Sequence, residues 1–180
     1  TMTFSIIARC ARTGQFGIAV SSSSPAVASR CAFARAGVGV VATQNITDPR
    51  LGPQGLDLMA RGATAAQCRD ILVQNAAFAQ FRQLAIIDAH GGTAVWSGTH
   101  TLCCHAVSMQ ANVASAGNLL AQEGVPDAVT RAFGESDESL PLGERLLVAM
   151  RAGLEAGGEA GPLRSAGMIV VARQDWPLVD

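Results

Sequence analysis

The beginning of the chain combines hydroxyl side chains with the chain's own α-amino group. Thr1 and Thr3 open the first apolar run, and four serines, Ser21 to Ser24, follow the second run. An α-amino group has a reference pKa of about 7.7–8.0 and acts as the base for a neighbouring hydroxyl nucleophile in some enzymes. A threonine here would therefore supply both the nucleophile and the base of a hydrolytic reaction.

A β-hairpin is predicted to position these hydroxyl groups. Apolar residues alternate through residues 3–10 and 16–20, and Gly14 suits the turn between them because it accepts a positive φ. With a turn centred near residues 13–14, antiparallel counting places Thr3 opposite Ser24 and Ser5 opposite Ser22. The other faces of both strands are uncharged, so the hairpin is expected in an inner layer of the fold.

The composition limits the classes of protein to which the chain can belong. Its 180 residues, 49% of them apolar, suit one domain spanning 1–180 with a substantial core. No apolar run reaches the roughly 18–20 residues of a membrane span and no signal peptide is evident, so a cytoplasmic protein with no membrane partner is expected. Five irregularly spaced cysteines suit a reducing compartment. A formal net charge of −1 and few aromatic residues argue against nucleic acid as a partner.

Arginine supplies every basic side chain, because none of the 13 basic residues is lysine. A titrating amine can therefore come only from the α-amino group, and guanidinium groups would bind any anionic part of a substrate. The candidate substrate contacts are Arg30, Arg35 and Arg82. The alternative at Arg82 is a solvated or structural arginine at the start of a strand.

The remaining sequence predicts strands interrupted by two pairs of helices. Helices are expected from about 53 to 61, from 64 to 73 after a capping box at Thr64 and Gln67, from about 126 onward, and from 142 to 156. Strands are expected at 36–44, 82–88, 93–97, 107–118 and 164–171. This order differs from the regular alternation of a doubly wound fold and favours helices outside two inner sheets.

Polar residues at strand ends complete the candidate site. Ser115 and Asn118 lie where a predicted strand gives way to a turn, and Gln44 ends another strand. Asn118 either shapes that turn or directs its N–H at a developing oxyanion. Ser22 and Ser24 are candidate substrate contacts, with a simple polar strand end as the alternative.

No metal site or cofactor is predicted. Cys103, Cys104 and His105 are adjacent in sequence, so they do not easily close a tetrahedral site, and no second pair has metal-ligand spacing. His90 is expected in a hairpin turn and His100 in a loop. No Ser-His-Asp arrangement can be assigned from the sequence.

Several motifs occur together in a characteristic order. They are TFSIIAR at 3–9, TGQFGIAV at 13–20, ARAGVGVVATQ at 34–44, GPQGLDL at 52–58, RQL at 82–84, GNLLA at 117–121 and ERLL at 144–147. From Thr3 to about Val171 the chain thus resembles the DUF1028 family, bacterial proteins placed in the N-terminal-nucleophile (Ntn) hydrolase superfamily. The resemblance implies an α+β fold, a four-layer αββα sandwich with two mostly antiparallel sheets between helical layers. It leaves the reaction and the substrate open.

The resemblance also implies that the threonine matching Thr3 becomes the first residue, because family members usually begin Met-Thr-Phe. Here Thr1 precedes Met2. Either Thr1 is the working terminus, or translation starts at Met2, or trimming exposes Thr3, or the site is inactive. Proteasome-like Ntn hydrolases keep a catalytic lysine in the segment of Arg30 and Arg35, so the arginines exclude that mechanism. Family members also tend to continue past the position of Asp180.

We therefore expect an Ntn-type amidohydrolase that cleaves a C–N amide bond of a small polar metabolite. An N-terminal threonine would be the nucleophile, its α-amine the base, and Asn118 with backbone N–H groups would stabilise the oxyanion. One alternative is a non-catalytic binding or assembly protein with the same fold. Another is a hydrolase whose nucleophile is a serine among Ser21 to Ser24. The high apolar fraction favours a homo-oligomer.

Overall fold

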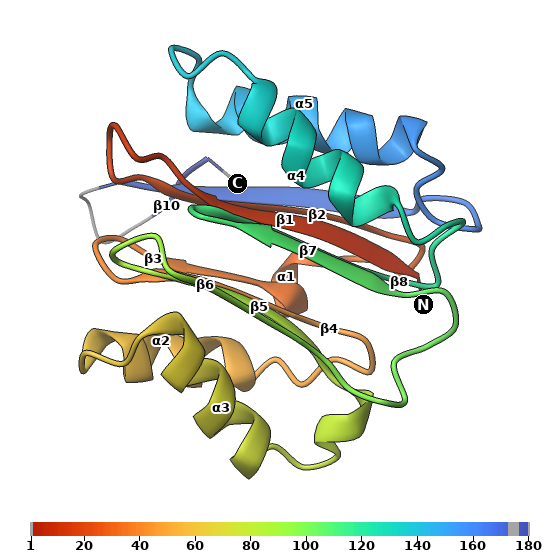
Figure 1. Cartoon of the computed structure of the whole chain (residues 1–180). Coiled ribbons are helices and arrows are strands. Elements are labelled where there is room, and N and C mark those ends of the chain that lie inside the picture. The colour runs from red at the N-terminus through yellow and green to blue at the C-terminus, as the bar shows by residue number, and fades with distance from the viewer. Residues whose placement is uncertain (1, 173–176, 180) are drawn as a thin grey trace.

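The computed structural model describes residues 2–172 and 177–179, which form two antiparallel sheets with helices on their outer faces (Figure 1). The larger sheet has the strand order β10-β9-β2-β1-β8-β7, and the smaller has the order β3-β4-β5-β6. The strands are β1 (Thr3–Arg9), β2 (Phe16–Ser22), β3 (Ala32–Arg35), β4 (Gly39–Gln44), β5 (Gln83–Asp88), β6 (Thr93–Ser97), β7 (Ala106–Gln110), β8 (Val113–Asn118), β9 (Ser165–Val171) and β10 (Pro177–Val179). A mixed α+β fold with two antiparallel sheets is therefore confirmed.

Five α-helices are present among the described residues. They are α1 (Ala28–Cys31), α2 (Leu51–Ala60), α3 (Ala65–Asn75), α4 (Val125–Glu135) and α5 (Leu142–Glu155), and a short 3-10 helix covers Ala79–Phe81. The capping box before α3 is confirmed, because Thr64 Oγ1 accepts from Gln67 N–H and Gln67 Oε1 accepts from Thr64 N–H. None of these helices is long and apolar enough to cross a bilayer.

The predicted hairpin of β1 and β2 is present, but its predicted register was wrong. Cys10 N–H donates to Gln15 O, so the turn is centred earlier than the sequence suggested. Thr3 consequently lies opposite Ser22, and Ser5 lies opposite Val20, a shift of two residues along β2 from the prediction. Gly14 in the turn has the expected positive φ, 73°.

Two other predicted strands were also wrong in extent. The strand expected at 107–118 is a hairpin of β7 and β8, with Asn112 in its turn at φ 66°. The apolar alternation continues on both sides of that turn, so periodicity alone does not reveal it, and asparagine tolerates the left-handed conformation. The strand expected at 36–44 begins only at Gly39, after a turn from β3.

Three clusters of apolar side chains fill the spaces between the layers that Figure 1 shows. Phe4 of β1 and Leu146 of α5 belong to the cluster between the larger sheet and helices α4 and α5. Ile18 and Ile87 belong to the cluster between the two sheets. Leu84 belongs to the cluster between the smaller sheet and helices α2 and α3. Because side chains alternate along β1, the odd-numbered residues from Thr3 face the smaller sheet.

Candidate active site

Thr3 and Ser22 form the centre of a buried hydroxyl cluster at the beginning of β1. Each is at most 4% exposed, and their Oγ atoms are 3.0 Å apart. They are directly opposite each other in the β1–β2 ladder, which places both side chains on the face towards the smaller sheet. The sequence-based expectation that Thr3 meets hydroxyl groups of β2 is thus met, with Ser22 as the direct partner.

The hydrogen bonds of Ser22 define which hydroxyl donates. Ser22 Oγ donates to the carbonyl oxygen of Met2 at 2.5 Å. A serine hydroxyl has one proton, so Ser22 Oγ must act as acceptor towards Thr3 Oγ1. Ser23 N–H also donates to Met2 O, at 3.2 Å. The carbonyl of the peptide bond preceding Thr3 therefore lies between two donors, beside the Thr3 hydroxyl.

Ser24 and Arg30 extend this cluster towards α1. The Oγ atoms of Ser24 and Ser22 are 2.9 Å apart, and Ser24 Oγ accepts from an Nη of Arg30. Arg30 also donates to the carbonyl oxygens of Pro25, at 2.7 Å, and Ala26, at 3.2 Å. One of the three predicted arginines is thus in contact with the serines.

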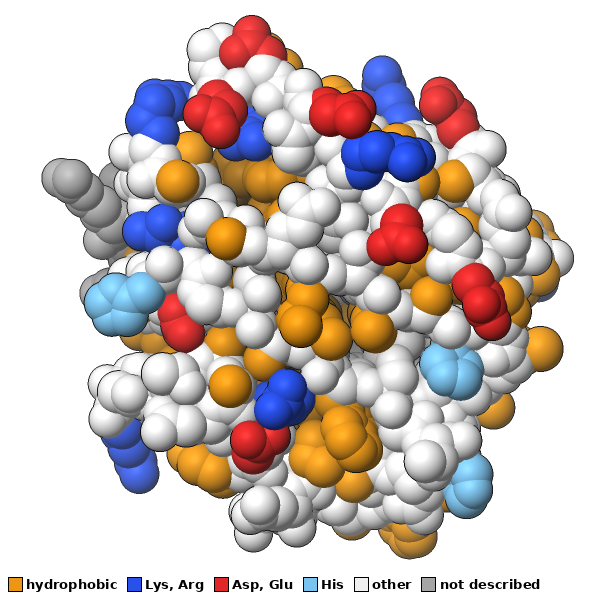
Figure 2. Space-filling model, in the orientation of Figure 1, with side chains coloured by type: hydrophobic (Ala, Val, Ile, Leu, Met, Phe, Trp, Pro, Cys, Tyr) orange, Lys and Arg blue, Asp and Glu red, His pale blue; other side chains and the backbone are white. Residues whose placement is uncertain are grey.

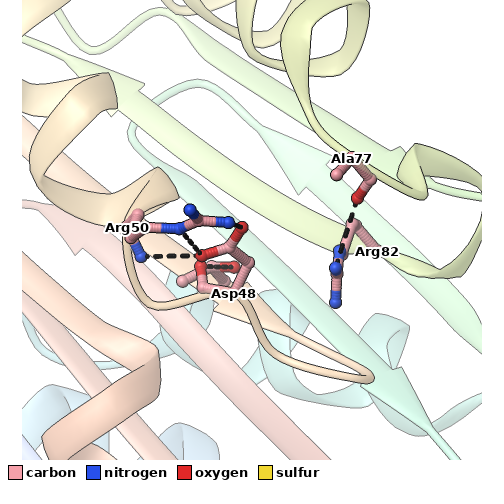
Figure 3. Close-up of polar contacts among 5 residues, drawn as sticks. Asp48, Arg50, Ala77 and Arg82 are labelled. Carbon is pink, nitrogen blue, oxygen red and sulfur yellow. Dashed lines mark hydrogen bonds and ion pairs between the residues drawn. The ribbon is translucent and has the colours of Figure 1, made fainter.

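The other two predicted arginines have contacts elsewhere. Arg35 forms an exposed ion pair with Asp57 of α2, at 2.9 Å. Arg82 is buried and donates to Ala77 O at 3.2 Å, with its Nε unpartnered among the described residues. Figure 3 shows Arg82 apart from the neighbouring fork of Arg50 and Asp48, whose hydrogen bonds lower the pKa of the Asp48 carboxyl.

Next to the hydroxyl cluster, hydrogen bonds of side-chain amides connect the two sheets. Ser5 Oγ donates to Gln44 Oε1 at 2.8 Å, and Gln44 Nε2 donates to Gln83 Oε1 at 2.7 Å. Gln83 Nε2 donates to Ser97 Oγ at 2.9 Å and to Gly117 O at 3.0 Å. Gln44 was predicted to bind substrate, but both ends of its amide are engaged by protein groups. Its place in this chain of hydrogen bonds is structural support for β1.

Asn118 and Ser115 lie on opposite faces of β8. Asn118 is opposite Thr3 in the β1–β8 ladder, and its Nδ2 donates to Gln83 Oε1 at 3.2 Å. Ser115 Oγ donates to Ser5 O at 2.8 Å. Because the two residues are three apart on a strand, only Asn118 is on the face of Thr3. The structure brings Asn118 to the predicted site and does not bring the Ser115 hydroxyl there.

Glu159 is a site residue that the sequence did not reveal. It is 8% exposed, its Oε2 accepts from Ser23 N–H at 2.9 Å, and its Oε1 is buried without a partner among the described residues. Burial raises the pKa of Glu159 to about 7, and the hydrogen bond from Ser23 offsets part of that rise. The same N–H of Ser23 binds the Met2 carbonyl, so this carboxyl is close to the Met2–Thr3 bond.

Gln83 and Glu159 differ in how far the sequence could have revealed them. Gln83 follows Arg82 at the start of a correctly predicted strand, so its burial was open to prediction. Glu159 lies in a loop after α5, where an isolated bridge pairs its backbone with Leu120, and it is far from Ser23 in sequence. No periodic pattern identifies such a residue.

Thr1, the other candidate N-terminal nucleophile, lies outside the described residues. Cys103 is exposed, and Nδ1 of His105 is 2.8 Å from its carbonyl oxygen. Within residues 2–172 and 177–179, no three His, Cys, Asp or Glu side chains gather as a metal site would require.

On the face shown in Figure 2, acidic and basic side chains are interspersed rather than gathered by sign.

Comparison with known proteins agrees with the motifs in the sequence. The model of a family described as "Family of unknown function (DUF1028)" matches residues 3–180. The crystal structure of protein SPO2555 from Silicibacter pomeroyi, assigned to the same family, is similar with a TM-score of 0.91 and 28% sequence identity. This similarity covers 99% of the present chain and 77% of that one. Among curated proteins there is no match.

Proposed function

Because this chain belongs to the DUF1028 family, whose description gives no function, we propose its activity from the geometry around Thr3. The activity is hydrolysis of the C–N amide bond of a small polar molecule, with Thr3 as an N-terminal nucleophile. Under this proposal the two sheets and their outer helices are the αββα sandwich of an Ntn hydrolase.

One observation carries the proposal. The Thr3 hydroxyl donates to Ser22 Oγ, while Ser22 Oγ and Ser23 N–H both donate to the carbonyl oxygen directly before Thr3. A buried threonine that merely begins a strand needs one hydrogen-bond partner. Here a carbonyl lies beside the hydroxyl with two donors on its oxygen, which is the arrangement that stabilises an oxyanion during acyl transfer.

The reaction requires a free α-amine at Thr3. That amine takes the proton of the Thr3 hydroxyl while Oγ1 forms a bond to the substrate carbonyl carbon, and Ser22 Oγ with Ser23 N–H stabilises the oxyanion. The proton then passes to the leaving nitrogen as the C–N bond breaks. Water hydrolyses the resulting ester, which releases the acid and restores the hydroxyl.

Glu159 indicates the polarity of the substrate. Its Oε1 is buried and has no hydrogen-bond partner among the described residues, and such an oxygen is costly unless a donor reaches it. The carboxyl also shares the Ser23 N–H with the Met2 carbonyl. A substrate that carries an N–H or ammonium group next to its amide would supply the missing donor.

The test compares two forms of the protein. One retains Thr1 and Met2, and the other is produced with a single initiator Met before Thr3, so that aminopeptidase exposes the threonine. Intact mass identifies the first residue, and release of carboxylic acid is followed with a panel of small amides. We expect turnover only in the form that begins at Thr3, loss of it in Thr3→Ala, and partial retention in Thr3→Ser.

Other results would favour the alternatives. Equal turnover in both forms, abolished by Ser22→Ala but not by Thr3→Ala, would assign a serine nucleophile. Saturable binding of the amides without turnover in a form shown to begin at Thr3 would favour a binding protein. The Ser115→Ala variant is the matched control, because its hydroxyl is buried on the opposite face of β8.

A further inference from the structure

Asn118 presents an unused acceptor next to Thr3. The residue is 0% exposed, and its Oδ1 makes no hydrogen bond within the described part of the chain. Thr3 is its direct neighbour in the β1–β8 ladder, on the same face of the sheet. Native proteins rarely leave a buried side-chain oxygen unsatisfied, so this oxygen needs an explanation.

The surrounding hydrogen bonds determine which end of the Asn118 amide is left without a partner. The Gly117 carbonyl can only accept, so the group of Gln83 that contacts it must be Nε2. Gln83 Oε1 must then be the end that meets Asn118, at 3.2 Å, and only the Asn118 nitrogen can donate to it. The orientation of Asn118 follows from donor and acceptor chemistry alone, and its oxygen is the end left over.

We propose that Asn118 Oδ1 accepts a hydrogen bond from the α-amino group of Thr3 when the chain begins at that residue, with Gln83 as the residue that positions it. This inference rests on the proposed function, in which Thr3 is the first residue. A peptide nitrogen carries one proton, whereas a terminal ammonium carries three and needs further acceptors. Asn118 thus acts on the base of the reaction, in place of the oxyanion role expected from the sequence.

The absence of lysine permits a direct test. In a chain that begins at Thr3 the α-amine is the only primary amine, because all 13 basic residues are arginine. The rate of its acylation by acetic anhydride is measured at several pH values by mass spectrometry of the N-terminal peptide Thr3–Arg9, which contains no cysteine, after hydroxylamine has removed acetyl groups from hydroxyls. This rate reports the pKa of that one amine. No substrate or turnover is involved, so the result is independent of whether the proposed hydrolysis is correct.

Four variants of the chain beginning at Thr3 make the test specific. Asn118→Leu keeps the side-chain volume and removes the acceptor, so we expect the pKa of the α-amine to fall by about 1. Asn118→Asp adds a negative charge at the same place, and we expect that pKa to rise by at least as much. Ser115→Ala removes a buried hydroxyl and Ser97→Ala a partly buried one, neither of which contacts Asn118, and we expect no change from them.

The two Asn118 variants must shift the pKa in opposite directions. Far-UV circular dichroism establishes that each variant is folded, and if one is not, the other decides. An unchanged pKa in either folded variant would overturn the proposal. A fall of equal size in Ser115→Ala would also overturn it, because the shift would then reflect general loosening of β8.

Discussion

Thr3 and Ser22 are opposite each other in β1 and β2 with their Oγ atoms 3.0 Å apart, and Ser22 is also bonded to the carbonyl that precedes Thr3. The Ser22 side chain thus contacts both the candidate nucleophile, Thr3, and the carbonyl of the peptide bond that includes the Thr3 nitrogen.

Ser22→Ala should destabilise the protein by about 1–3 kcal/mol, because several buried groups lose their common partner. These groups are Thr3 Oγ1, Met2 O and Ser24. Urea denaturation measures the change. Ser29→Ala is the control, since Ser29 is exposed and its Oγ donates to Ala26 O, and this substitution should cost less than about 0.5 kcal/mol. An equal loss of stability in both variants would contradict the conclusion that Ser22 is the common hydrogen-bond partner of these groups.

Glu159 should make stability depend on pH. Its pKa is about 7 in the folded protein and 4.5 in the reference state, so the folded state binds the proton more tightly. The stability that this group contributes is fully present below pH 4.5 and is lost as the pH rises through 7. We expect a loss of about 1–3 kcal/mol over this range, measured by urea denaturation.

Glu159→Gln should remove most of that pH dependence, because a neutral amide keeps an oxygen for Ser23 N–H and carries no buried charge. Above pH 8 the variant should be more stable than the parent protein. Glu155→Gln, at an exposed position of α5, should leave the pH profile of the parent intact. A Glu159→Gln profile that still falls between pH 5 and 7 would assign the titration to another group.

Gln83→Leu should reduce the free energy of unfolding by roughly 3–5 kcal/mol, since it removes four hydrogen bonds and leaves the buried amide nitrogens of Gln44 and Asn118 without their acceptor. Gln74→Leu on the exposed face of α3 is the matched control and should change the free energy of unfolding by less than about 0.5 kcal/mol. A loss of less than about 1 kcal/mol in Gln83→Leu would show that this chain of amide hydrogen bonds contributes little to stability.

Arg30→Gln and Arg35→Gln should have different effects on turnover, although both arginines lie in the same segment. Arg30 contacts Ser24, whereas Arg35 pairs with exposed Asp57. We expect Arg30→Gln to reduce amide turnover at least about 10-fold in the form that begins at Thr3, and Arg35→Gln to leave it within about 2-fold. Similar losses in both variants would point to net charge rather than to the contact with Ser24.

Local signals predicted most of the elements. The capping box of Thr64 and Gln67 fixed the start of α3, and Gly14 supplied the positive φ that the first turn needs. The register of β1 against β2 was harder to predict, because a single hydrogen bond, from Cys10 N–H to Gln15 O, decides where the turn between them closes. The turn at Asn112 was missed because apolar alternation continues across it.

The hydroxyl cluster of the site was predictable because it depends on one hairpin, and Asn118 was expected beside it as the end of another strand. Thr3 and Ser22 meet because they are on neighbouring strands joined by a short turn. Gln83 reaches Asn118 only when the two sheets face each other, and Glu159 reaches Ser23 only through a loop beyond α5. Such contacts depend on tertiary packing between segments far apart in sequence, which carries no local pattern.

The Met2 carbonyl has a consequence for any molecule that binds at Thr3. It occupies the donors Ser22 Oγ and Ser23 N–H, and its covalent tether gives it an effective concentration of millimolar or above. Under the proposed function, the Met2 carbonyl of a chain that keeps Met2 would compete with the substrate carbonyl for these donors. Removal of that residue frees Ser22 Oγ and leaves Ser23 N–H shared only with Glu159 among its described partners, so under the proposed function the length of the N-terminus would set whether a carbonyl from outside can bind there.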